Sequence, residues 1–130
     1  MAMDCKELMI GDWLFCTSAQ CNVQVKAMPI NGVYGKGYRI IIDNDGFELV
    51  LREKHFDPIP LTAEILEKNG YKDERSNYAL RYDKYHICIY LADKKLSINS
   101  YGAVLDIHCR YVHQLQHALR LCGISKEIEL

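Results

Sequence analysis

The sequence lacks a long apolar run and carries almost no net charge. None of its apolar stretches approaches the ~20 residues that a membrane-spanning helix needs. Charged residues stand at Asp4, Lys6 and Glu7, where a signal peptide would have its apolar core. The formal net charge is −1, which argues against tight non-specific binding to nucleic acid, because such binding depends on many Lys and Arg side chains. We therefore expect a cytoplasmic protein that does not insert into membranes.

Low-complexity tracts are also missing, and only three of the 130 residues are proline. Large-scale disorder is therefore not expected. A chain of this length buries roughly two-thirds of the surface that its unfolded form exposes, so it can fold without a disulfide or a metal. Nine tyrosines stand against three phenylalanines. This ratio favours strands with one face in water, since tyrosine has an apolar ring and a polar tip.

The chain has no CxxC motif, although it contains six cysteines, at positions 5, 16, 21, 88, 109 and 122. An even number of cysteines indicates a disulfide framework only in a small exported domain. Cys16 and Cys21 are five positions apart, a looser spacing than that of usual zinc knuckles. Cys88 and Cys122 lie in apolar patterns and resemble small core residues. We expect reduced, mostly structural thiols and no cofactor.

Four short strands are predicted in the first half of the chain. Alternating or apolar segments place them at 13–17, 22–28, 38–42 and 47–51. The last two flank Asp43-Asn44-Asp45-Gly46, in which Asn and Gly tolerate the positive φ angles of a tight hairpin turn. Four such strands indicate a small curved antiparallel sheet or an SH3-like barrel at the N-terminus. Residues 57–62 follow as an extended linker, because each proline keeps its predecessor out of the helical region.

The second half predicts a helix, a meander and a second helix. Thr62 caps a helix over 63–68 that Gly70 ends, with Tyr71 packing back on Leu66. Strands are expected at 77–82, 85–91 and 95–99 as an antiparallel meander. Residues 101–109 are ambiguous, with a strand after a bend at 101–102 as one interpretation. A helix over 111–123 and an edge strand at 127–130 complete the chain.

The predicted fold class is α+β, with two helices covering antiparallel sheet. The length favours a single compact domain over residues 1–130. Within it, 1–57 and 58–130 are the candidate subdomains, the first barrel-like and the second arranged α-β-β-β-α.

The last helix carries two histidines one turn apart, His113 and His117. Their spacing resembles HExxH, in which both histidines bind zinc and the glutamate is the general base. Gln114 occupies the glutamate position and cannot take a proton at neutral pH. Arg120 adds a positive charge one turn beyond His117. The apolar residues form the stripe of a helix that docks on a sheet, at Val112, Leu115, Leu119 and Cys122. We therefore predict no metal site and place both histidines on or beside the solvent face, with His113 and His117 as the candidates if a metal binds.

No segment supplies a convincing catalytic set. None of the six cysteines stands in a nucleophile signature. Gly32 to Arg39 resembles a phosphate-binding loop only superficially, because it leads into a predicted strand and not into a helix. Its Tyr34 and Tyr38 beside Lys36 and Arg39 combine stacking rings with positive charge, which suits single-stranded nucleic acid or a nucleotide. The alternative is a solvated loop with ordinary surface tyrosines.

Three blocks carry a resemblance to a known group. They are KELMIGDW at 6–13, PIPLTAEILEKNGY at 58–71 and YVHQLQ at 111–116. With these blocks the chain resembles small uncharacterised proteins of gut Bacteroidetes and of their phages or mobile elements. The resemblance implies an accessory protein of a phage or integrated element, with no activity established for the group. In the related pattern the position of His117 is often Asn, which further weakens the metal interpretation.

These observations favour a non-enzymatic accessory protein that binds another macromolecule, most simply a protein. The discriminating feature would be an exposed apolar or tyrosine-rich patch on the folded surface. The alternative is a nucleic-acid or nucleotide-binding module that uses the loop from Tyr34 to Arg39. A hydrolase or metalloenzyme ranks third, because the catalytic residues that it requires are missing.

Overall fold

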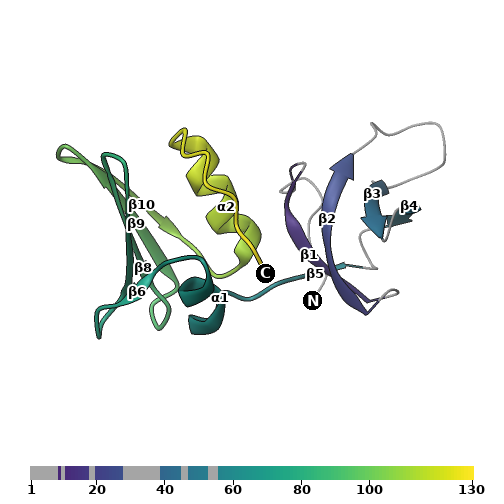
Figure 1. Cartoon of the computed structure of the whole chain (residues 1–130), viewed down its shortest axis with the longest axis horizontal. Helices are drawn as coiled ribbons and strands as arrows, with labels where there is room; N and C mark the ends of the chain where they lie inside the picture. Colours follow the sequence, from purple (N-terminus) through teal and green to yellow (C-terminus); the bar gives the residue numbers. More distant parts are fainter. Residues whose placement is uncertain (1–8, 10, 18–19, 28–38, 45–46, 53–55) are drawn as a thin grey trace. The chain divides into compact units, whose positions relative to one another are not determined.

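The structure is a computed structural model that describes residues 9, 11–17, 20–27, 39–44, 47–52 and 56–130. The chain divides into two compact units, Met1–Ile59 and Pro60–Leu130, which are described separately. Each unit contains an antiparallel sheet, and both helices of the described residues belong to the second unit (Figure 1). The predicted α+β class is therefore confirmed. Within the described residues, no helix is both long and apolar enough to cross a bilayer.

The first unit contains a sheet with the strand order β4-β3-β2-β1-β5. Its strands are β1 (Trp13–Cys16), β2 (Cys21–Ala27), β3 (Arg39–Asn44), β4 (Phe47–Arg52) and β5 (Phe56–Pro58). An irregularity between Val25 and Ala27 interrupts the register of β2, as a bulge that bends a strand does. Of the two predicted forms, the described residues show the open sheet, because β4 and β5 are its edges and no pairing joins them.

The strand β5 corrects the prediction of an extended linker at 57–62. Phe56–Pro58 pairs antiparallel with β1. Proline is tolerated there because β5 lies at the sheet edge, where a missing N–H removes no interior ladder bond. Phe56 is 1% exposed, so the short strand contributes a large side chain to the core of the first unit. The same core contains Leu14, Cys16, Val23 and Val25.

The second unit contains a meander with the strand order β10-β9-β8-β7-β6. Its strands are β6 (Lys72–Asp73), β7 (Tyr78–Tyr82), β8 (Tyr85–Tyr90), β9 (Lys95–Ser100) and β10 (Ala103–His108). The three predicted strands are confirmed, and the ambiguous stretch at 101–109 contains β10. Tyr101 and Gly102 form the connecting turn, with φ angles of +48° and +87°. Two positive φ angles are typical of the type I′ turns that suit two-residue hairpins.

The helices α1 (Ala63–Lys68) and α2 (Val112–Leu121) lie on one side of this sheet (Figure 1). The phenolic O–H of Tyr85 in β8 donates to the carbonyl oxygen of Cys122 at 2.8 Å, which ties the end of α2 to that face. The sheet and helix side chains between them are almost fully buried, as shown by Ile87, Ile89, Leu96 and Ile98 of the sheet and Val112, Leu115 and Leu119 of α2. The predicted apolar stripe is confirmed for these three helix residues.

Both helices end in the same hydrogen-bonded motif. In α1 the N–H of Tyr71 donates to the carbonyl of Leu66 at 3.0 Å, and Gly70 adopts φ +90°. In α2 the N–H of Ile124 donates to the carbonyl of Leu119 at 2.8 Å, and Gly123 adopts φ +73°. These are the bonds of a Schellman motif, in which glycine takes a left-handed conformation at little cost. Both predicted stops are confirmed.

The predicted strand at 127–130 is wrong, because residues 124–130 contain no strand. A side chain holds this segment in place of a sheet ladder. The amide of Asn69 donates to the carbonyl of Glu129 at 2.7 Å and accepts from the N–H of Glu129 at 2.8 Å. It also donates to the carbonyl of Ile65 at 2.8 Å. Asn69 therefore joins the end of α1 to the C-terminal segment, and Ile128 beside Glu129 is buried.

Two Tyr→Phe variants should differ in their effect on stability. Tyr85→Phe removes a hydrogen bond, so we expect the free energy of unfolding to fall by about 1 kcal/mol. Tyr71 is 2% exposed, and its hydroxyl has no hydrogen-bond partner in the described part of the chain. Tyr71→Phe should leave the free energy of unfolding unchanged or raise it by about 1 kcal/mol, since it removes a buried unsatisfied group. Urea unfolding measures both values, and a loss of stability in both variants would contradict the assignment for Tyr71.

Candidate binding edge of the second sheet

The structure corrects the predicted placement of His113 on α2, whereas His117 is half-buried, beside the solvent face as predicted. His113 is 2% exposed, so it does not lie on the solvent face. Its ring stacks on Tyr111 with the centroids 5.8 Å apart, and the ring of His117 meets it edge-on at 5.6 Å. Among the described residues, no group of three His, Cys, Asp or Glu side chains is arranged to hold a metal ion. The two rings therefore pack as aromatic neighbours.

Gln114 caps the N-terminus of α2, a role that the comparison with HExxH does not predict. Its side-chain oxygen accepts from the N–H of Arg110 at 2.7 Å and from the N–H of Tyr111 at 3.0 Å. Tyr111 is the N-cap of α2 and Gln114 is the third helical residue. A Gln that reaches back to the N-cap N–H is half of a capping box. The sequence signal was missed because Tyr111 is not one of the usual N-cap residues.

The other predicted site residues lie mostly outside the described residues. Tyr34, Lys36 and Tyr38 are among the residues that the structure does not describe, and Arg39 is the first residue of β3. Nucleotide or nucleic-acid binding by this loop therefore stays a prediction.

The described cysteines, at positions 16, 21, 88, 109 and 122, are free thiols. Burial raises the pKa of Cys109 to about 12. Burial also raises the pKa of Cys88, with a smaller contribution from Glu74 that Arg81 partly offsets. The sulfur of Cys88 lies 3.7 Å from Nε2 of His86. Because a raised pKa keeps a thiol protonated and only the thiolate is strongly nucleophilic, this pair lacks the activation of a thiol enzyme.

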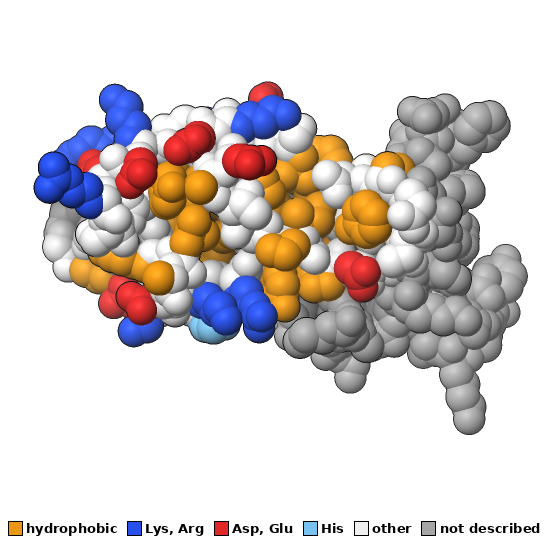
Figure 2. Space-filling model, turned by 90° about the horizontal axis from the view of Figure 1, so that it is seen from below, with side chains coloured by type: hydrophobic (Ala, Val, Ile, Leu, Met, Phe, Trp, Pro, Cys, Tyr) orange, Lys and Arg blue, Asp and Glu red, His pale blue; other side chains and the backbone are white. Residues whose placement is uncertain are grey.

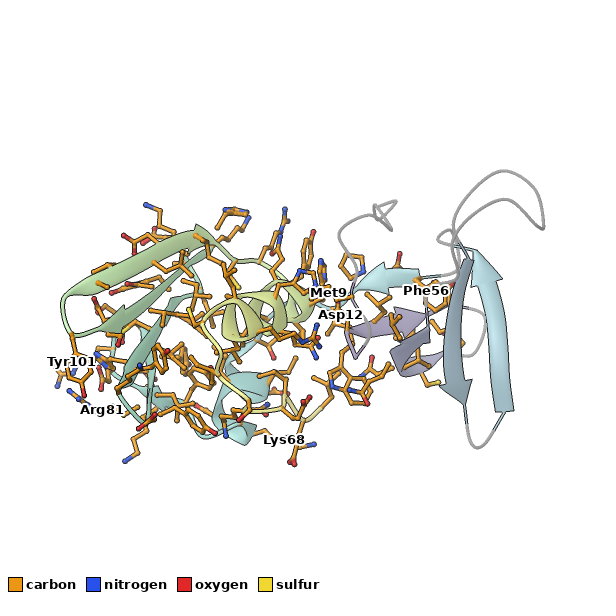
Figure 3. The ribbon with its side chains drawn as sticks, turned by 90° about the horizontal axis from the view of Figure 1, so that it is seen from above. Met9, Asp12, Phe56, Lys68, Arg81 and Tyr101 are labelled. Carbon is orange, nitrogen blue, oxygen red and sulfur yellow. The ribbon has the colours of Figure 1, made fainter. Side chains whose placement is uncertain are left out.

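Exposed apolar side chains of the second unit lie at the edge strand β10 and at the end of α2, where Leu121 is 75% exposed. Val104 is 55% exposed, and Tyr101 in the preceding turn is 91% exposed. Leu105 and Ile107 of the same strand are half-buried. Tyr101 lies at the same end of the sheet as Arg81 (Figure 3), and Lys and Arg side chains lie among Asp and Glu side chains at that end (Figure 2). The edge therefore combines apolar side chains with charged residues of both signs nearby.

The turn geometry fixes which backbone groups of β10 are used by β9. In a two-residue hairpin the flanking residues, here Ser100 and Ala103, form a hydrogen-bonded pair, and such pairs alternate along the ladder. The N–H of Cys109 donates to the carbonyl of Lys94 at 2.9 Å, which continues the same alternation. The backbone groups that point away from β9 are consequently those of Val104, Asp106 and His108.

A hollow of about 450 Å³ adjoins this edge. The register places its polar lining residues in two rows across the strands. His108 lies directly opposite Lys95, and Asp106 lies directly opposite Ser97. Tyr90 of β8 pairs with Lys95 from the other side. All five side chains belong to the face of the sheet opposite the helices, since strand residues alternate between faces. The hollow thus offers an aromatic wall, two nitrogen bases and a carboxylate next to the outward backbone groups.

Because Gln114 caps α2, we expect two substitutions at this position to differ in their effect on stability. Gln114→Ala removes the acceptor of two N–H groups and should lower the free energy of unfolding by about 1 kcal/mol. Gln114→Glu retains an acceptor and places a negative charge at the helix N-terminus, so it should be at least as stable as the parent. Urea unfolding at neutral pH measures both. Equal stability of the parent and the Ala variant would show that the cap contributes nothing.

Comparisons with known proteins give no match to this chain, whether with protein-family models, with curated proteins or with solved structures.

Proposed function

We propose that this chain is a non-enzymatic protein that binds an extended segment of another protein by strand addition at β10. The observation that carries the proposal is the outward backbone of Val104, Asp106 and His108 on an exposed apolar edge. An edge strand with free N–H and C=O groups is a template for a further strand. In this mode main-chain hydrogen bonds provide affinity, and pockets for alternate side chains provide specificity.

The side chains around β10 indicate the chemistry of the partner segment. On the helix side, Leu105 and Ile107 are half-buried, so an added strand with apolar residues at alternate positions would complete their burial. On the opposite side, the hollow contains Lys95, His108 and Asp106, and an acidic side chain placed beside Lys95 and away from Asp106 would form a charge-assisted pair. We therefore infer a partner segment that alternates apolar residues with polar ones, carries an acidic residue and lacks proline at its centre.

A second copy of this chain is a poor partner for the same edge. A two-fold antiparallel pairing that engages all three outward residues must be centred on Asp106. It would place Asp106 directly opposite its own copy, and like charges directly opposite each other destabilise a strand pair. A charge on an edge strand is a known device against self-pairing. This supports a heterologous partner.

Binding of this kind fits the accessory role that the sequence resemblance implies, and it requires no catalytic group. We propose together with it that the partner segment is acidic, that the protein acts in a phage or mobile-element context, and that it is located in the cytoplasm.

Proline at position 106 should strongly weaken strand addition. The outward N–H of Asp106 is not used by β9, and proline is tolerated on the solvent side of an edge strand. We expect peptides selected on the purified chain from a random displayed library to bind the parent and Asp106→Asn, which keeps the N–H. Asp106→Pro should weaken binding at least tenfold, as titration of the synthesised peptide would measure.

Hydrogen exchange provides an independent readout if the proline variant does not fold. The bound peptide should protect the amides of Val104, Asp106 and His108, which are exchangeable in the free protein. Failure to select any peptide, or a bound peptide that protects other amides and not these three, would contradict strand addition.

Removing the edge charge should promote self-association. Asp106→Val eliminates the like-charge contact and extends the apolar edge, so the variant should dimerise at concentrations at which the parent stays monomeric. Sedimentation velocity compares the two proteins directly, with Asp106→Lys as the control that retains a charge. A monomeric Asp106→Val variant would argue against β10 as an edge competent for pairing.

A further inference from the structure

Cys16 and Cys21 are directly opposite each other at the end of the β1–β2 hairpin. The register pairs Leu14 with Val23 and Cys16 with Cys21. Because paired residues of an antiparallel ladder project to the same face, both thiols belong to the core side that Leu14 and Val23 occupy. The sequence did not predict this pairing. The spacing of five residues fits no metal motif, and the register of the two strands is known only from the structure.

The ladder also indicates how far apart the two cysteines are. The N–H of Val25 donates to the carbonyl of Asp12 at 2.9 Å, so this pair is of the hydrogen-bonded kind. Alternation makes Cys16 and Cys21 a hydrogen-bonded pair as well, and the Cα atoms of such pairs are about 5.5 Å apart. This separation lies inside the ~4.4–6.8 Å range of disulfides. The Cα separation therefore allows a disulfide, and closing it requires the Cβ atoms, which are up to about 5.5 Å apart in such pairs, to approach to about 4.5 Å or less.

The two thiols differ in their access to solvent. Cys16 is 0% exposed, whereas Cys21 is only partly buried. Cys21 is therefore the more accessible residue of the pair, and Cys16 is its buried neighbour on the adjacent strand. An accessible thiol next to a protected resolving thiol is the arrangement of thiol-based redox sites.

We propose that Cys16 and Cys21 form an oxidisable dithiol that reacts with low-molecular-weight disulfides of the glutathione type. The thiolate of Cys21 attacks one sulfur of the oxidised disulfide, forms a mixed disulfide and releases one small thiol. The sulfur of Cys16 then attacks the sulfur of Cys21 and displaces the second small molecule as a thiolate, which takes up the proton that Cys16 gives up. The protein gains one disulfide and loses two hydrogens, and the small disulfide is reduced to two thiols.

The other described cysteines provide controls within the same chain. Cys88 lies opposite Ala79 and Ser97, so it has no opposed thiol. Burial raises the pKa of Cys109 to about 12, which keeps that thiol protonated. Cys122 is partly buried at the end of α2 and tests whether partial exposure alone gives the same reaction.

Peptide mapping after incubation with oxidised glutathione tests the proposal. Cys16 and Cys21 lie between Lys6 and Lys26 with no other Lys or Arg in between, so trypsin leaves them on one peptide. We expect that peptide to lose two hydrogens, and dithiothreitol to reverse the change. Circular dichroism before and after treatment establishes that the folded protein is the reacting species.

Single substitutions separate the two roles. Cys16→Ala should stop the reaction at a stable glutathione adduct on Cys21, because the resolving thiol is gone. Cys21→Ala should leave Cys16 unmodified in the folded protein. Cys122→Ser is the matched control and should oxidise at the hairpin as the parent does. A stable glutathione adduct on Cys21 in the parent, or no modification of the hairpin peptide, would overturn the proposal, and neither result bears on β10.

Discussion

The second unit depends on the burial of one face of a five-stranded sheet beneath its helices. Val112, Leu115 and Leu119 of α2 and the isoleucines of β8 are removed from water together, and such burial contributes roughly 25 cal/mol per Å² of apolar surface. The helical layer covers only one face and leaves β10 at an uncovered edge. The proposed function follows from this asymmetry, because the side that stabilises the unit and the side available for binding are different parts of the same sheet.

Local chemistry explains why the sequence predicts much of the fold. The bounds of α1 follow from Thr62, whose hydroxyl accepts from the N–H of Ile65 at 3.2 Å, and from Gly70, which occupies the left-handed region. Gly123 ends α2 in the same way. Signals within a few residues decide these features. The strand β5 was missed because it depends on a partner that is distant in sequence, β1. The strand β6 contains only two residues, Lys72–Asp73, which are too few to show an alternating pattern.

The candidate sites illustrate the same limit. His113 and His117 have a recognisable spacing, yet the rings pack against each other and against Tyr111. The residues of the two proposed sites, at the β10 edge and in the β1–β2 hairpin, match no sequence motif. The hydrogen-bond alternation of the β9–β10 ladder determines that the backbone groups of Asp106 and His108 point outward. The register of the β1–β2 hairpin places Cys16 opposite Cys21. Both arrangements depend on which strands pair and in which register, and the sequence pattern alone does not predict that pairing.

Asn69 is also a potential site of deamidation. It precedes Gly70, and in an unfolded chain an Asn–Gly peptide is prone to deamidation, because the unhindered glycine nitrogen attacks the side-chain carbonyl. In the folded protein the amide is fixed by its bonds to Ile65 and Glu129, and the N–H of Gly70 donates to the carbonyl of Glu67. Each opening of the α1 terminus exposes the amide to a reaction whose carboxylate product cannot donate to Glu129. The bond that holds the C-terminus therefore also protects the protein against chemical ageing.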